Sequence, residues 1–179
     1  LLLRLVTEVG ILELPPVVHL FSLLAVVSMV TGNVLALLQE NVKRLLAYSS
    51  IAHFGYVLVA LLAGGPPAAE AVTFYVIVYC AMSLGAFGVV TVYSSEGGEK
   101  DRVEDYQGLF WTRPWLAGML ALSLLSLAGI PVTAGFIGKF YAITAGVEAG
   151  LWWLVLALIG NSVVSLYYYL RLFVTLFGE

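Results

Sequence analysis

Five long apolar segments constrain what this chain can fold into more than any other feature of its sequence. A helix needs about 20 residues to cross a hydrocarbon core of roughly 30 Å, whereas a transmembrane β-strand shows about ten residues of alternating polarity. The runs here are continuous and too long for strands. Because a helix satisfies its own backbone groups in lipid, we predict an all-α fold, a polytopic transmembrane helical bundle, with spans over residues 15–39, 45–63, 70–93, 115–147 and 151–177.

The composition agrees with a chain that lies mostly in lipid. Hydrophobic residues make up 61% and charged residues 11%, against roughly 45–50% and 25% in soluble domains. We expect one membrane domain over residues 1–179. Residues 1–7 look like the end of a sixth span, and no Met opens the chain. The sequence therefore predicts a piece of a longer polytopic protein.

The connections between the segments predict an orientation. Residues 40–44 and 94–114 carry five of the eight Lys and Arg residues, whereas residues 64–69 and 148–150 carry none. Cytoplasmic connections of membrane proteins are enriched in Lys and Arg. We therefore expect the connections 40–44 and 94–114 to be cytoplasmic.

Lys139 lies in the apolar segment 115–147, which is too long for one simple crossing. Pro131 removes a backbone hydrogen bond near its middle, and Gly129 and Gly135 loosen the adjoining turns, so we predict a broken helix there. A charge within a bilayer is costly and commonly marks an ion pathway or proton relay. The alternative is a lysine whose long side chain reaches the membrane surface.

His53 is the second candidate for moving protons. Ser49, His53 and Tyr56 lie four and three residues apart, on one face of a helix. Imidazole titrates near neutral pH, so such a stripe suits a proton path, although a histidine hydrogen-bonded between packed helices is an equal alternative. Two further stripes are either interhelical contacts or supporting groups around Lys139: Tyr75, Tyr79 and Ser83, and Asn161, Ser165 and Tyr168.

Motifs for other chemistries do not occur in the sequence. It has no Gly-rich nucleotide loop, no H-E-x-x-H, no C-x-x-C and no paired His at haem spacing. Its single cysteine, Cys80, cannot form an intramolecular disulfide or hold an iron–sulfur cluster. We expect this chain to bind no redox cofactor, no metal and no nucleic acid.

Three stretches carry a resemblance to a known family. They are "QENVKRLLAYSSIAHFGYVLVAL", "GLFWTRPWLAGMLALSLLSLAGIPVTAGFIGKFYAI" and "LYYYLRLFV". They resemble the antiporter-like proton-translocating subunits of respiratory complex I, closest to the N-type branch of bacterial NADH:quinone oxidoreductase. The resemblance implies a longer subunit of two inverted repeats, of which this chain holds most of the second. It also implies that the discontinuous helix carries a functional lysine at Lys139.

The resemblance implies a multi-pass protein of the bacterial inner membrane that works with other complex I membrane subunits. Lys139 would exchange protons with His53 through buried water, while NADH and quinone would bind to other subunits. Sister subunits carry histidines and a lysine where this chain has Tyr75, Tyr79 and Ser83, which leaves the outlet of the path open. The alternatives are a subunit of a multi-subunit sodium/proton antiporter or membrane-bound hydrogenase, and a scaffold in which Lys139 only pairs with a carboxylate.

Overall fold

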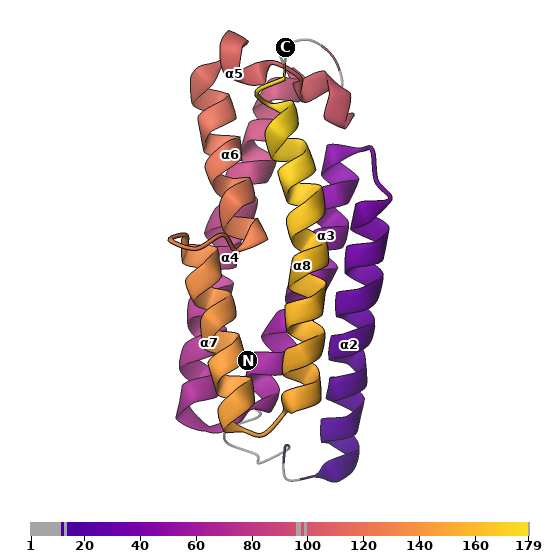
Figure 1. The fold of residues 1–179 in the computed structure, drawn as a ribbon, viewed down its shortest axis with the longest axis vertical. Helices are drawn as coiled ribbons and strands as arrows, with labels where there is room; N and C mark the ends of the chain where they lie inside the picture. The colour runs from indigo at the N-terminus through magenta and orange to yellow at the C-terminus, as the bar shows by residue number, and fades with distance from the viewer. Residues whose placement is uncertain (1–11, 13, 96–97, 99, 179) are drawn as a thin grey trace.

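The computed structural model describes residue 12, residues 14–95, residue 98 and residues 100–178. Within these residues the regular structure is helical, with seven α-helices and one short 3-10 helix (Figure 1). The predicted end of a further span at residues 1–7 lies outside the described residues. The elements are α2 (Pro15–Leu37), α3 (Val42–Leu62), α4 (Gly65–Ser95), η2 (Val103–Tyr106), α5 (Leu109–Thr112), α6 (Pro114–Ala128), α7 (Ala134–Glu148) and α8 (Trp152–Thr175).

Four of the helices, α2, α3, α4 and α8, are long and apolar enough to cross a membrane. Two of them begin earlier than the sequence predicts. The Asn41 side chain accepts a hydrogen bond from the Arg44 N–H and caps α3. The turn predicted between α3 and α4 is shorter than expected, because Pro66 and Pro67 belong to the first turn of α4. Proline is tolerated there since its missing N–H would have no partner in the helix.

The segment predicted as one broken helix forms two helices, α6 and α7, which lie end to end along the bundle in Figure 1. Gly129 ends α6 with a left-handed φ of 80°, and its N–H bonds the carbonyls of Leu125 and Ser126. Pro131 follows, and the Thr133 side chain then caps α7 by accepting the Phe136 N–H. The predicted break is therefore present, although Gly129 ends α6 two residues before Pro131.

The central helix of the bundle is α3. Of its most apolar stretch 67% is buried, against 33% or less for the other three long helices. It packs tightly on α2, because a Cβ on Gly32 would lie 2.5 Å from the Ala52 backbone nitrogen and one on Gly55 would lie 2.7 Å from the Ala25 carbonyl oxygen. Small residues allow such close approach between membrane helices.

Two apolar clusters fill the bundle, one toward each end. The first includes Leu46 of α3 and Tyr168 of α8, and the second includes Tyr56 of α3 and Leu158 of α8. Between the two clusters lie polar side chains of α2, α3, α7 and α8, together with the break between α6 and α7. We call this region the polar layer and define it by Asn33, Ser49, His53, Lys139, Asn161 and Ser165.

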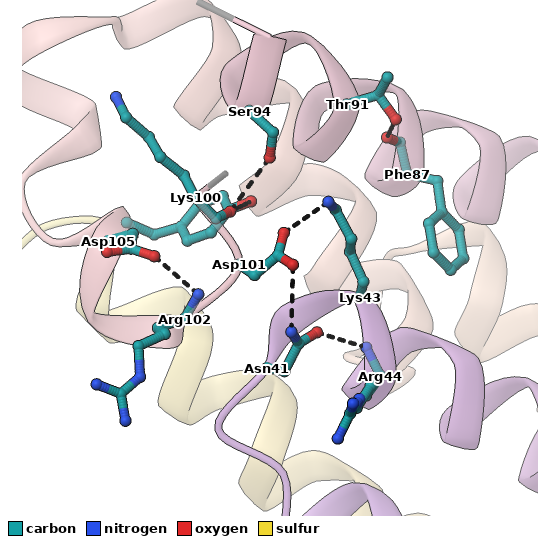
Figure 2. A network of polar contacts seen from close by, with 11 residues as sticks. Asn41, Lys43, Arg44, Phe87, Thr91, Ser94, Lys100, Asp101, Arg102 and Asp105 are labelled. Atoms are coloured by element: carbon teal, nitrogen blue, oxygen red, sulfur yellow. Dashed lines mark hydrogen bonds and ion pairs between the residues drawn. The ribbon is translucent and has the colours of Figure 1, made fainter. Parts of the chain in front are cut away.

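One end of the bundle is tied together by the connections that carry most of the basic residues. The Val42 N–H donates to the Asp101 carbonyl oxygen at 2.7 Å, and the Val103 N–H donates to the Glu40 carbonyl oxygen at 2.9 Å. Figure 2 shows the ion pair of Lys43 and Asp101, whose Nζ and Oδ1 atoms are 2.6 Å apart. The connection 94–114 therefore includes an ordered part that contains η2 and α5.

Candidate functional site

Lys139 is buried, with 5% of its surface exposed. Its ammonium donates a hydrogen bond to the carbonyl oxygen of Ala128, the last residue of α6, at 2.9 Å. The last carbonyls of a helix have no partner inside the helix and carry partial negative charge, so they favour a cation. The side chain thus points back toward the break rather than onward to the surface, contrary to the alternative of a lysine that reaches the membrane surface.

The side chain of Lys139 fits only because Gly129 has no side chain. A Cβ on Gly129 would lie 2.9 Å from Lys139 Cδ and 3.1 Å from its Nζ. Gly135 has a similar role at the start of α7, where its N–H bonds the Ser126 Oγ at 3.0 Å. A Cβ there would lie 1.8 Å from the Ser126 carbonyl oxygen. Both predicted break glycines therefore set how closely the two helix ends approach.

Val132 is the strained residue of the break. It has a φ of 80°, in the left-handed region, and it is 99% exposed. A β-branched residue there is an outlier, and left-handed backbone costs an ordinary residue roughly 1–2 kcal/mol. Such strain persists where the surrounding structure fixes the backbone and is common at functional sites.

His53 lies in the middle of α3, 2% exposed, with a tyrosine hydroxyl at each ring nitrogen. Its Nδ1 lies 2.8 Å from the Tyr75 hydroxyl and its Nε2 lies 3.2 Å from the Tyr169 hydroxyl. A neutral imidazole has one donor and one acceptor nitrogen, so one tyrosine must donate to it and the other must accept from it. Tyr169 was not among the residues singled out in the sequence.

Tyr56 lies between the two candidates. Its ring meets the His53 ring edge to face, with centroids 5.4 Å apart. The Lys139 ammonium lies 5.4 Å from the centroid of the same ring, within range of a cation–π contact. The two predicted relay residues thus share one neighbour, as the helical spacing of His53 and Tyr56 suggests.

Of the other predicted supporting residues, some form hydrogen bonds to a neighbouring helix and some bond only within their own helix. Tyr79 donates to Ser50 at 2.6 Å. Ser49 and Ser165 bond carbonyls of their own helices, at Leu46 and Ser162. Among the described residues, no hydrogen bond connects Ser83 to His53 or Lys139.

Asn161 and Tyr168 both bond Asn33, a residue that the sequence predictions missed. They therefore converge on α2 instead of on Lys139. The signal that identifies Asn33 is an amide within an apolar helix, because polar side chains within membrane helices usually bond a neighbouring helix.

A groove of about 400 Å³ is lined by the residues of the break and by Lys139. Its walls come from the end of α6, from α7 and from α8, and they are apolar except near Lys139 and Ser162. No group of three His, Cys, Asp or Glu side chains that could hold a metal ion occurs in the described part of the chain. The polar layer contains two amides, which do not carry protons at neutral pH, together with an ammonium, an imidazole and hydroxyls, which can exchange them.

Comparisons with known proteins identify the family of the chain. Residues 2–165 match the family described as "NADH:quinone oxidoreductase/Mrp antiporter, TM". The chain is 57% identical to NADH-quinone oxidoreductase subunit N of Ectopseudomonas mendocina, covering 89% of this chain and 33% of that one. It is 55% identical to the subunit of the same name in Chromohalobacter salexigens, covering 88% and 34%.

A solved structure shows the same fold. One chain of respiratory complex I from Thermus thermophilus with bound aureothin superposes with a TM-score of 0.77 at 37% identity, covering 92% of this chain and 37% of that one. The chain spans about a third of the length of the curated relatives it matches. Because the family match extends over most of the sequence, the chain belongs to the transmembrane family of NADH:quinone oxidoreductase and Mrp antiporter subunits.

Proposed function

We propose that this chain is part of subunit N of a bacterial NADH:quinone oxidoreductase and that it moves protons across the membrane. The relatives named subunit N, more than half identical to it, support this assignment. In this proposal, NADH and quinone bind to other subunits of the complex, and electron transfer there is coupled to proton movement through the polar layer.

The observation that carries the proposal is a buried ammonium that has no neutralising carboxylate in the described part of the chain. Lys139 bonds a neutral carbonyl oxygen, and among the described residues no carboxylate lies within 4.0 Å of its Nζ. Burial disfavours the charged form of an amine, and a neutral carbonyl compensates less than a carboxylate would. Lys139 is therefore suited to gain and lose a proton, and no ion pair among the described residues explains its burial.

His53 supplies the second step of the proposed route. Its two ring nitrogens contact hydroxyls from different helices, Tyr75 on α4 and Tyr169 on α8, so a proton can be received on one side and released on the other. Tyr56 and buried water would bridge Lys139 to His53. The hydroxyl of Tyr79, bonded to Ser50, would continue the route along α4.

The same proposal orients the chain in the membrane. The four long helices make one crossing each, and α6 with α7 makes the fifth. Arg171 near the end of α8 bonds the Gln39 carbonyl oxygen, which places it at the same end as Lys43 and Asp101. This basic end faces the cytoplasm of a bacterial inner membrane, and the other membrane subunits of complex I pack around the bundle.

The test is the ratio of protons pumped to NADH oxidised, in vesicles that contain the assembled complex with the complete subunit. Lys139→Met removes the titratable group, and Lys139→Arg keeps a charge that does not deprotonate. Both should lower the ratio. Lys100→Met is the matched control, because Lys100 lies over the Tyr93 ring in the connection after α4. Normal pumping by an assembled Lys139→Met complex would refute the proposal.

A further inference from the structure

We propose that Asn33 is a positioning residue of the proton route, whose amide fixes the Tyr56 hydroxyl and ties α2 and α8 to the polar layer. This inference rests on the function proposed above. Asn33 is buried, 1% exposed, near the C-terminal end of α2. A neutral amide does not carry a proton at physiological pH, so Asn33 would act only through the groups that it holds.

The amide of Asn33 joins three side chains from two other helices. Its Nδ2 donates to the Tyr56 hydroxyl and to the Asn161 Oδ1, each at 3.1 Å. Its Oδ1 accepts from the Tyr168 hydroxyl at 2.9 Å. Both N–H donors of the amide are therefore used, and the network is nearly saturated.

The direction of these bonds follows from Asn161. Its own Nδ2 donates to the Ala157 carbonyl oxygen at 2.9 Å, so its Oδ1 must face Asn33. Asn33 must then present its NH₂ group to Asn161, which turns its Oδ1 toward Tyr168. A flipped Asn33 amide would place two carbonyl oxygens against each other.

The orientation of the Asn33 amide determines which of the Tyr56 and Tyr168 hydroxyls donates its proton to the amide. Tyr168 uses its O–H to donate to Asn33. Tyr56 accepts from Asn33, so its own O–H proton is directed away from the amide. Tyr56 is the residue whose ring contacts both His53 and the Lys139 ammonium. The bond to Asn33 thus does not use the O–H donor of Tyr56, and it holds in place the residue whose ring lies between the two relay residues.

The backbone holds Asn33 firmly in this place. Its neighbour Gly32 packs against the α3 backbone, and Gly55, the neighbour of Tyr56, packs against α2. The two close approaches fix the separation of α2 and α3 beside both partners of the bond. The amide and the hydroxyl are therefore preorganised, and little rotamer freedom remains to be lost when they pair.

The test uses the assembled complex in vesicles, with Asn33→Leu, Tyr56→Phe and the double variant in the complete subunit. Asn33→Leu keeps the size of the side chain and removes its hydrogen bonds. We expect it to lower coupled turnover by roughly tenfold, the effect of about 1.4 kcal/mol on the rate-limiting barrier, and to displace the pH dependence of that turnover. The double variant should be no slower than the slower single variant, because Asn33 acts through Tyr56.

The matched control is Thr31→Val, which removes an exposed hydroxyl bonded within α2 to the Val27 carbonyl. It should leave turnover and its pH dependence unchanged. If Asn33→Leu does not assemble, Asn33→Ser replaces it, and failure of both to assemble would assign Asn33 to folding and overturn the inference.

Two results separate this inference from the function on which it rests. Native coupling in an assembled Asn33 variant, together with lost pumping in Lys139→Met, overturns the role of Asn33 alone. Normal pumping by Lys139→Met overturns the proposed function itself. Effects of Asn33→Leu and Tyr56→Phe that simply multiply in the double variant would show that Asn33 acts independently of Tyr56 and would also overturn the inference.

Discussion

The Lys139 ammonium reaches back along its own helix to bond the carbonyl oxygen of Ala128, the last residue of α6, at 2.9 Å. The break in the helix therefore supplies the partner of the buried cation. A continuous helix would have used that carbonyl in its own ladder of hydrogen bonds. The break and the lysine form one structural unit, in which the last carbonyl of α6 accepts a hydrogen bond from the ammonium carried by α7.

Gly129→Ala should displace Lys139 from this position. The new methyl group would lie 2.9 Å from Lys139 Cδ, and the φ of 80° disfavours any residue with a Cβ. The left-handed backbone alone costs roughly 1–2 kcal/mol. We expect the assembled complex to unfold at a lower temperature and to pump fewer protons per NADH. Gly118→Ala in α6 is the control, because a Cβ there meets open space; an equal effect of both would contradict the contact with Lys139.

Tyr169→Phe should leave one nitrogen of His53 without a partner in the interior. A buried polar group deprived of its hydrogen bond costs about 1–3 kcal/mol, and the variant would interrupt the proposed proton route at α8. We expect lower thermal stability and lower coupled turnover than in the native complex. Tyr167→Phe changes the same chemical group on the same helix, where the side chain is 62% exposed, and should be silent. Native coupling in Tyr169→Phe would remove this bond from the route.

Much of the fold follows from the sequence because lipid leaves few alternatives. The long apolar runs identify four spans, and the proline with its neighbouring glycines identifies the break between α6 and α7. The exact ends were missed where local capping decides them. Asn41 starts α3 early, and Thr133 restarts the chain as α7. Capping depends on one side chain, and the apolar pattern does not record it.

The candidate site was predicted less completely than the fold. Helical spacing places His53 and Tyr56 on one face, and the cost of a buried charge singles out Lys139. Spacing within one helix does not show which helices are neighbours, so the contacts of Tyr169 with His53 and of Asn33 with Tyr168 were not foreseen. Both depend on how α8 packs on α2 and α3.

The ion pair of Lys43 and Asp101 should make the link between the connections 40–44 and 94–114 sensitive to acid. We call this link the clasp. The hydrogen bond from Lys43 holds the pKa of the Asp101 carboxyl below its ordinary value of 3.8, against a smaller opposing effect of burial. The folded pKa is lowered, so the stabilisation is present above about pH 4. It is lost as the pH falls through the folded pKa. Between pH 5 and 8 the clasp should be insensitive to pH.

Hydrogen exchange measures this clasp directly, through the amides of Val42 and Val103 that bond across it. After correction for intrinsic rates, their protection in the native complex should stay level down to about pH 4 and fall below it. Asp101→Asn should show weaker protection at neutral pH and no such fall. Glu104→Gln, at an exposed position of η2, is the control. Protection in Asp101→Asn equal to that of the native chain would show that the backbone bonds alone hold the clasp.

Gly32→Ala should force α2 away from α3. The added Cβ would lie 2.5 Å from the Ala52 nitrogen and 2.9 Å from the Tyr48 carbonyl oxygen, both backbone atoms that no rotamer change can move. Overpacking of this kind costs about 1–3 kcal/mol. Because Asn33 is the next residue, the displacement also lengthens its bonds to Tyr56 and Tyr168, so assembly and coupling should fall together.

Gly88→Ala in α4 provides the comparison, since a Cβ there meets no atom within 4 Å. Alanine in a helix interior is favoured over glycine by about 0.5–1 kcal/mol, so Gly88→Ala should assemble at least as well as the native chain. The thermal midpoint of the assembled complex distinguishes the two variants. If Gly32→Ala is as stable as Gly88→Ala, the close packing of α2 on α3 does not hold the amide of Asn33 in place, and its bonds to the tyrosines must be strong enough to form without that support.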